Sequence, residues 1–204
     1  YNSNGDLTSI TNALGKISTR TYDNGGRMVT ATHPLLHTTT YTYDNANRVL
    51  TVTDPRSGVT TNTYDWVGNL LTVTDPLIHT TTYAYTVKDQ LHTVTDAEGY
   101  VTTYGYDTVG NRISVKDGNN HTTTFVYDGA NRLLSATNPL SKTITYTYDA
   151  NGNRTAVTDP FGHATTYIFD ALNRMTTQTD ALSHATVTTY DAVGNVLTVT
   201  DANN

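Results

Sequence analysis

One aromatic residue recurs every 21 positions along this chain, and the register never slips. The series is Tyr1, Tyr22, Tyr43, Tyr64, Tyr85, Tyr106, Tyr127, Tyr148, Phe169 and Tyr190. In eight of these ten repeats the next residue is Asp, whereas the first and fifth repeats carry Asn2 and Thr86. Self-similarity at a fixed period is the signature of a repeat protein, in which each repeat packs on its neighbours along the chain. The sequence therefore predicts a single tract of about ten repeats over residues 1–204.

Each repeat contains two places where the chain is expected to reverse. If the recurring aromatic residue is position 1, position 5 is a residue that tolerates a positive φ. Position 5 is Gly5, Gly26, Asn47, Gly68, Asp89, Gly110, Asn131, Gly152, Asn173 and Gly194. The Asp at position 2 can bond the backbone of the same turn. A second turn is indicated at position 12, where Asp or Asn often precedes Pro, as in Asp159-Pro160.

The segments between the turns are expected to be β-strands. Residues 143–148 and residues 70–74 are typical, because they are short and rich in β-branched and aromatic residues. Alternation along a strand places Tyr146 and Tyr148 on one face and threonines on the other. The fold class predicted is all-β, with tandem 21-residue hairpins forming a long antiparallel sheet.

The register of the hairpin is expected to pair position 1 with position 8. Leu50 and Val52, at positions 8 and 10, would then join the tyrosine face, although a slip of one residue would invert this arrangement. Open twisted sheets seldom exceed about ten strands without curling, so about twenty strands should wind into a spiral, a hollow shell or a tube. The competing architecture is a solenoid with one 21-residue coil per rung, which would have parallel rather than antiparallel strand pairs.

Composition argues against several other classes of protein. The formal net charge is -6 and the pI is about 5.5, which opposes the basic surface that nucleic acids require. No cysteine is present, so neither disulfides nor thiolate metal sites can form. No apolar stretch approaches the length of a membrane span. The sequence begins and ends in the middle of its pattern, which predicts that it is a segment of a longer chain.

Several repeats resemble the YD repeat of Rhs-family proteins. The motifs that carry this resemblance are Tyr106-Asp107-Thr108-Val109-Gly110-Asn111-Arg112 and Tyr148-Asp149-Ala150-Asn151-Gly152-Asn153-Arg154 followed by Asp159-Pro160-Phe161-Gly162. The resemblance covers the whole chain. It implies large bacterial secreted or surface polypeptides, with relatives in insecticidal toxin complexes and animal teneurins, whose repeats wind into a hollow cocoon. In the toxins this cocoon holds an unfolded effector, but neither a core signature nor a toxin domain is recognisable in this sequence.

The constant period distinguishes this chain from cocoon walls of varying repeat length. Repeats related by one screw motion can continue indefinitely, so an open-ended extracellular tube is one hypothesis. The function predicted is a non-enzymatic wall segment of a shell or tube, outside the cell or on its surface. Its partners would be neighbouring repeats of the same or identical chains, and an encapsulated polypeptide where a cocoon forms. An encapsulating segment of a polymorphic toxin and a carbohydrate-binding aromatic repeat module are the alternatives.

No residue is predicted to be catalytic, and no cofactor or metal is expected. Five histidines occupy position 16, namely His37, His79, His121, His163 and His184. Most of them are two repeats apart, too far for one metal ion, so a role in the turn or strand entry is expected. The arginines after the first turn are interpreted as braces that bond the Asp of the same turn, and these are Arg27, Arg48, Arg112, Arg132, Arg154 and Arg174.

The tyrosine, aspartate and glycine positions are predicted to be the structural keys of the repeat. The Tyr-Asp keys are Tyr22-Asp23, Tyr43-Asp44, Tyr64-Asp65, Tyr106-Asp107, Tyr127-Asp128, Tyr148-Asp149 and Tyr190-Asp191. The glycine keys, at the left-handed position, are Gly110, Gly152 and Gly194.

Overall fold

The computed structural model of the chain describes residues 1–202, which form β-strands joined by turns and contain no helix. The strands are β1 (Ser9–Thr11), β2 (Ile17–Tyr22), β3 (Met28–Thr32), β4 (Thr38–Tyr43), β5 (Val49–Thr53), β6 (Val59–Tyr64), β7 (Leu70–Thr74), β8 (Thr80–Tyr85), β9 (Leu91–Thr95), β10 (Val101–Tyr106), β11 (Arg112–Lys116), β12 (Thr122–Tyr127), β13 (Leu133–Thr137), β14 (Thr143–Tyr148), β15 (Arg154–Thr158), β16 (Ala164–Phe169), β17 (Met175–Thr179), β18 (Ala185–Tyr190) and β19 (Val196–Thr200). None of the described segments is a helix with the length and hydrophobicity needed to span a membrane.

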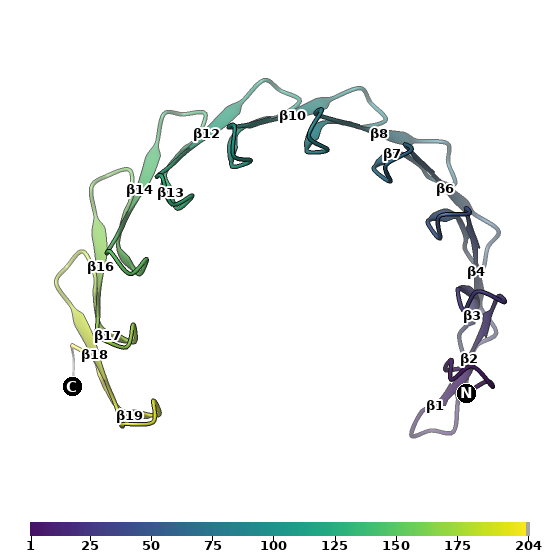
Figure 1. The fold of residues 1–204 in the computed structure, drawn as a ribbon, viewed down its shortest axis with the longest axis horizontal. Helices are drawn as coiled ribbons and strands as arrows, with labels where there is room; N and C mark the ends of the chain where they lie inside the picture. Colours follow the sequence, from purple (N-terminus) through teal and green to yellow (C-terminus); the bar gives the residue numbers. More distant parts are fainter. Residues whose placement is uncertain (203–204) are drawn as a thin grey trace. The chain divides into compact units, whose positions relative to one another are not determined.

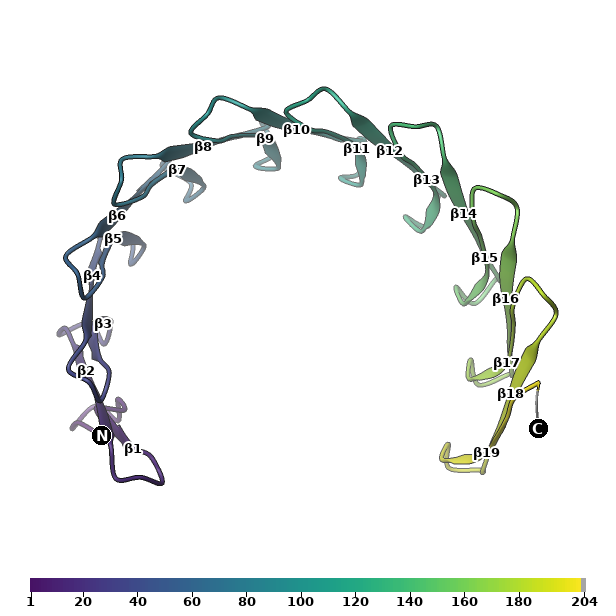
Figure 2. The same cartoon turned by 180° about the vertical axis from the view of Figure 1, so that it is seen from behind.

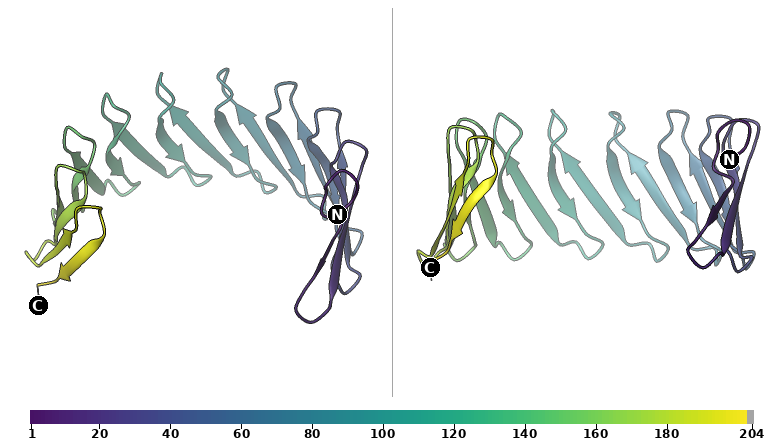
Figure 3. Two further views of the ribbon diagram at one scale, coloured as in Figure 1. Left: turned by 60° about the horizontal axis from the view of Figure 1, so that its bottom comes forward. Right: turned by 90° about the horizontal axis from the view of Figure 1, so that it is seen from below.

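The chain divides into an N-terminal half, Tyr1–Thr102, and a C-terminal half that begins at Thr103, within β10. In each half, every strand pairs antiparallel with the strands that precede and follow it in the sequence (Figures 1 and 2). The turns within a half lie alternately at the two opposite ends of its strands (Figure 3). The all-β class and the tandem antiparallel hairpins are thus confirmed, and the parallel solenoid is wrong. The winding of the sheet into a spiral stays a prediction.

Both turns of the repeat have the same construction. In the first turn of one repeat, the N–H of Gly26 donates to the carbonyl of Asp23, and the N–H of Asp23 donates to the carbonyl of Arg27. The second turn repeats this pattern between positions 12, 15 and 16. Each is therefore a three-residue hairpin loop whose last residue is left-handed. All ten residues at position 5 have a positive φ, from 58° at Asp89 to 110° at Gly68.

The register differs by one residue from the prediction, because the hairpin closed by the first turn contains a β-bulge. Tyr41 pairs with Val52 and Thr42 with Thr51, but Tyr43 then pairs with Val49. Leu50 is thereby left out of the pairing, so position 1 faces position 7 and not position 8. A bulge inserts one unpaired residue into a strand and increases its local twist. The alternation of residues along a strand cannot reveal such an insertion. Beyond the bulge, Val52 pairs with Tyr41 on the tyrosine face as predicted.

The two faces of the sheet carry different side chains, and no residue among 1–202 is buried. In β4, Tyr41 and Tyr43 are half-buried, while Thr40 and Thr42 are exposed. On the exposed face, threonine hydroxyls bond across the strand pairs, as between Thr42 and Thr51 at 2.7 Å. The sheet is therefore a single layer held by main-chain bonds and cross-strand contacts, without a core between layers.

The second turn of the fourth repeat contains a strained residue that the sequence pattern does not favour. Ile78 has a φ of 69° and is 83% exposed. A β-branched residue in the left-handed region is unfavourable, and this side chain gains little from burial. Gly99 and Gly162 occupy the same position in other repeats with φ of 87° and 89°.

Replacement Ile78→Gly is expected to raise the free energy of unfolding by about 1 kcal/mol, because it removes that backbone strain. Denaturant titration of the intact chain measures the change. The neighbouring variant Leu77→Ala is the control, since Leu77 is 75% exposed and is not among the residues with positive φ. A destabilised Ile78→Gly chain would contradict the expectation.

Candidate functional site

The first turn is organised by one carboxylate in the eight repeats that carry Asp at position 2, whereas Asn2 and Thr86 accept the loop N–H groups in the other two. In Asp128, Oδ1 accepts the backbone N–H groups of Ala130 and Arg132 at 2.9 and 3.0 Å, and Oδ2 accepts Nε of Arg132 at 2.7 Å. The same arrangement occurs at Asp23, Asp44 and Asp170, where the Arg lies four residues on. One Asp thus satisfies two backbone donors of the loop and fixes the side chain that leaves the turn.

The arginine at position 6 also joins its turn to the next repeat. Arg132 Nη1 donates to the carbonyl of Asp149 at 3.0 Å, and the guanidinium lies 4.7 Å from the ring centroid of Tyr148. Arg27, Arg48 and Arg174 make the equivalent bond at 2.7–3.0 Å and lie 4.7–5.1 Å from the corresponding ring. A single side chain therefore contacts the Asp of its own turn, the carbonyl of the next turn and the next tyrosine.

An asparagine performs this role in other repeats. Asn153 Nδ2 donates to Oδ2 of Asp149 at 2.9 Å and to Oδ1 of Asn173, in the next repeat, at 2.8 Å. Asn69 and Asn111 bridge neighbouring turns in the same way. An Asn at position 6 follows Gly at position 5, as in Asn153 after Gly152, whereas Arg follows Asn at position 5 in three of four cases. The first turns of neighbouring repeats are therefore joined by two forms of the same bridge, one made by Arg and one by Asn.

The tyrosine at position 1 reaches back to the preceding repeat. The hydroxyl of Tyr148 donates to the carbonyl of Leu133, fifteen residues earlier, at 2.9 Å. Tyr22, Tyr43, Tyr64, Tyr85, Tyr127 and Tyr190 make the equivalent bond at 2.7–3.2 Å. The acceptor is always the carbonyl at position 7, next to the bulge. Phe169 lacks the hydroxyl, so the carbonyl of Arg154 does not receive this bond.

The sequence of the chain matches the model of a known protein family. A profile described as RHS repeat matches residues 1–35, 85–122, 106–143, 127–164, 148–185 and 169–204, which together are more than half of the chain. The chain belongs to the RHS repeat family. No curated protein sequence matches it.

Solved structures share the fold of this RHS tract. A crystal structure of TcdB2-TccC3-Cdc42 has 21% sequence identity and a TM-score of 0.65, with 90% of this chain and 12% of that chain covered. A crystal structure of TcdB2-TccC3 without its hypervariable C-terminal region has 17% identity and a TM-score of 0.65, with 98% and 15% covered. The RHS tract therefore spans a small fraction of the length of those chains.

The structure places every predicted key of the RHS repeats within this network or beside it. The seven aspartate keys lie at the first turns and the seven tyrosine keys end the preceding strands. Gly110, Gly152 and Gly194 have φ of 102°, 92° and 96°. Sequence reasoning did not identify the bridging role of Asn69, Asn111 and Asn153, although their recurrence at position 6 was visible. The energetic importance of the keys stays a prediction.

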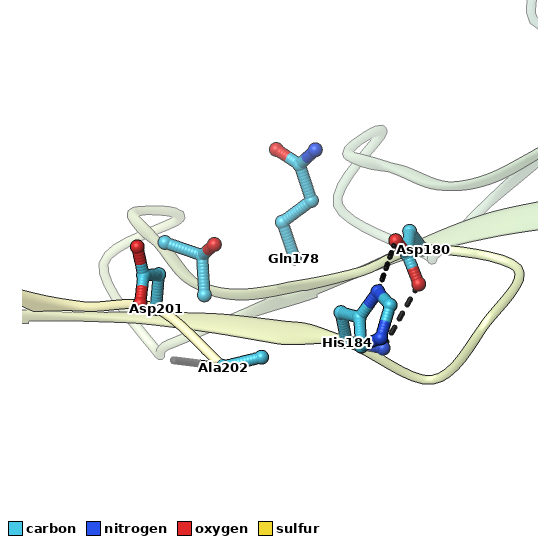
Figure 4. A pocket seen from close by; sticks show the side chains of 6 residues that line it. Gln178, Asp180, His184, Asp201 and Ala202 are labelled. Atoms are coloured by element: carbon cyan, nitrogen blue, oxygen red, sulfur yellow. Dashed lines mark hydrogen bonds and ion pairs between the residues drawn. The ribbon is translucent and has the colours of Figure 1, made fainter. Parts of the chain in front are cut away.

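Four of the five histidines at position 16 pair with the Asp at position 12 of the same second turn. His184 Nδ1 lies 3.0 Å from Oδ2 of Asp180, beside a pocket of about 220 Å³ that Asp201 also lines (Figure 4). His79, His121 and His163 make similar contacts at 2.9–3.3 Å. No group of three or more His, Cys, Asp or Glu side chains in residues 1–202 is arranged to hold a metal ion. His37 shares its turn with His33 instead of an Asp.

Two of the six arginines predicted to brace the turns do not do so. Arg112 and Arg154 occupy position 7, one residue beyond the bridging arginines, and this shift places them on a strand. Arg154 lies 5.8 and 5.7 Å from the ring centroids of Tyr146 and Tyr167. Arg112 lies 5.9 and 5.6 Å from those of Tyr104 and Phe125. Each guanidinium is therefore flanked by aromatic rings of the two adjacent strands and not by the carboxylate of the turn.

Acid is expected to destabilise the first turns of the RHS repeats. The backbone N–H of the arginine four residues on, followed by its side chain, lowers the pKa of Asp23, Asp44 and Asp128 below the ordinary value of 3.8. Because the pKa is lower in the folded than in the unfolded chain, the stabilisation is complete above about pH 4 and is lost as the pH falls through the folded value. The melting temperature should therefore fall as the pH drops below about 4.

A triple variant, Asp23→Asn, Asp44→Asn and Asp128→Asn, tests the cause of that fall. Asn138 already accepts the N–H groups of Leu140 and Lys142 in a second turn, so an amide can replace the carboxylate as acceptor. The variant should start with a lower melting temperature and lose less of it in acid. An acid dependence as steep as that of the parent chain would show that these carboxylates are not responsible.

Proposed function

We propose that this RHS tract is a structural wall segment of a hollow shell or an open-ended tube. The observation that carries the proposal is the one-layer sheet of each half, in which no residue among 1–202 is buried and side chains such as Arg132 and Asn153 join the first turns of neighbouring repeats. A layer of this kind separates two spaces without enclosing a core of its own. Within residues 1–202 the repeated turns present no single distinctive constellation of reacting groups, so the proposed role is not enzymatic.

The proposed partners are neighbouring repeats, either of the same chain or of identical chains. The tips of the second turns expose apolar side chains, with Leu36 84%, Ile78 83% and Phe161 75% exposed. Exposed apolar groups at the edges of a sheet favour contact with another surface. We infer that these tips pack against other turns of the wall.

The tract is proposed to be a single repeat region within a longer extracellular or surface polypeptide of bacterial origin. Its coverage of 12–15% of the TcdB2-TccC3 chains supports a segment of a larger protein. The family resemblance supports secretion. A cocoon around a polypeptide cargo is the form that this resemblance favours, whereas the constant 21-residue period favours an open tube.

Cryo-electron microscopy of the native assembly that contains the tract tests the proposal. Hollow particles of fixed size would support a closed cocoon, and tubes of unlimited length would support a filament. Solid particles, with density for other domains packed against both faces of the RHS sheet, would overturn the wall function.

A further inference from the structure

Arg154 is set apart from the arginines that join the turns. It lies at the start of β15, is exposed, and pairs across the bulge with Tyr148. Its guanidinium lies between Tyr146 of β14 and Tyr167 of β16. Arginine carries five N–H donors in the plane of the guanidinium, and a cation–π contact with a ring does not require a hydrogen bond from any of them. The aromatic setting therefore holds the cation in place without consuming its donors.

The donors of Arg154 have no acceptor among residues 1–202. In contrast, Arg132 uses Nε on Asp128 and Nη1 on the carbonyl of Asp149. The structure records only the two ring contacts for the guanidinium of Arg154. A guanidinium fork held in this way is suited to a carboxylate, which it can bind through two parallel N–H···O bonds.

A pocket lies beside this guanidinium. It measures about 300 Å³ and is lined by Tyr148, Arg154, Tyr167, Phe169 and Met175. This volume is at the lower end of the roughly 300–1,000 Å³ found for small-molecule sites. The pocket lining combines one cationic residue, Arg154, with three aromatic residues and a methionine.

Phe169, which also lines this pocket, leaves a hydrogen-bond position vacant at the carbonyl of Arg154. In seven other repeats a tyrosine hydroxyl donates to the carbonyl at position 7, and the equivalent carbonyl here is that of Arg154. Because Phe169 has no hydroxyl, a hydroxyl of a ligand can occupy the vacant position. The carbonyl and the guanidinium belong to the same residue, so the carboxylate and hydroxyl of the ligand must lie close together.

We propose that Arg154 and the surrounding rings form a binding site for a hexuronate, a sugar acid that carries a carboxylate and neighbouring hydroxyls on one pyranose ring. The carboxylate binds the guanidinium, one hydroxyl donates to the Arg154 carbonyl, and the C–H face of the sugar packs on the aromatic lining. This site is independent of the wall function, because a wall segment needs no ligand. The same chemistry is present in free galacturonate and in acidic glycans.

The site at Arg112 provides a natural comparison within the C-terminal half. Its guanidinium is also flanked by two rings, but its carbonyl already accepts the hydroxyl of Tyr127 at 3.2 Å. The hydroxyl position is thus filled at Arg112 and vacant at Arg154. Hexuronate should therefore prefer Arg154, and the single change Tyr127→Phe should create a similar vacancy at Arg112.

Titration of the intact chain with galacturonate, followed by nitrogen-15 spectra of the arginine Nε–H groups, tests the site. The Arg154 resonance should shift with galacturonate, shift far less with acetate, and stay in place with galactose. Trigalacturonate, used in a parallel titration, distinguishes an acidic glycan from the free sugar by tighter binding. Equal shifts with acetate and galacturonate would overturn the sugar site and leave only a general anion contact.

Three variants test the assignment to these residues. Arg154→Gln should weaken galacturonate binding about tenfold or more, as loss of a charged bond of about 1.4 kcal/mol does. Phe169→Tyr should also weaken galacturonate binding, because the new hydroxyl fills the vacant position while Arg154 is kept. This second variant keeps the test decisive if the Arg154→Gln chain fails to fold. Tyr127→Phe should add a shift at Arg112. Unchanged binding in Phe169→Tyr would overturn the proposal.

Discussion

Replacement Gly152→Val should lower the free energy of unfolding by about 2–3 kcal/mol. Gly152 has a φ of 92° in the first turn of its repeat, and its N–H donates to the carbonyl of Asp149. A side chain built on Gly152 would meet only Arg132 Nη1, at 4.0 Å, so crowding is not the cause. The cost arises because a β-branched residue is strongly disfavoured at positive φ, and relief of that strain would break the turn.

Gly129→Val in the preceding repeat is the matched control. Gly129 also lies in a first turn, but it is not among the glycines with positive φ, and a Cβ there would meet no atom within 4 Å. This change should alter stability by no more than about 0.5 kcal/mol. Urea titration of both variants gives the comparison. Equal destabilisation at the two positions would show that the left-handed conformation is not what the repeat requires.

Tyr148→Ala is expected to cost about 2–3 kcal/mol, and Tyr148→Phe about 1 kcal/mol. The alanine variant loses a half-buried ring and its contact with the Arg132 guanidinium at 4.7 Å. The phenylalanine variant loses only the hydroxyl that donates to the Leu133 carbonyl. The difference between the two variants separates the ring from the hydrogen bond. Urea titration measures both.

Phe169→Tyr is the converse change and should raise stability by about 1 kcal/mol, because it supplies the bond that its repeat lacks. A double-mutant cycle between Tyr148→Ala and Arg132→Ala should give a coupling of about 0.5–1 kcal/mol. Additive effects in that cycle would mean that the ring and the guanidinium act separately, and that the bridge between repeats does not depend on their contact.

Local turn chemistry could be predicted from the sequence because it depends on few residues. A Gly at position 5, such as Gly152, preceded by Asp149 specifies a left-handed loop regardless of what lies around it. The left-handed conformation of Ile78 could not be predicted in this way. Its type does not favour positive φ, yet the closing bonds of the second turn hold it there, since its N–H donates to the carbonyl of Asp75.

The strand register and the roles of Arg112 and Arg154 could not be predicted, because both depend on the bulge. The bulge does not change the alternation of apolar and polar residues in the sequence. The unpaired residue, Leu50 in the third repeat, is as apolar as its neighbours. Once Tyr43 pairs with Val49, position 7 becomes the first residue of the strand. Arg112 and Arg154, at position 7, therefore lie between aromatic rings. An arginine at position 6 instead bridges two neighbouring turns, as Arg132 does.

The order of strands in the sheet has a consequence for how the chain acquires its structure. The side-chain bonds that link neighbouring repeats join residues close in sequence, such as Tyr148 with Leu133 at 15 positions and Asn153 with Asn173 at 20 positions. Sheets usually fold slowly because their strands are distant in sequence, and this one avoids that delay. Each new repeat can dock on the one before it as soon as it leaves the ribosome. The nascent chain would therefore fold from its N-terminal end, one hairpin at a time, at the pace of translation.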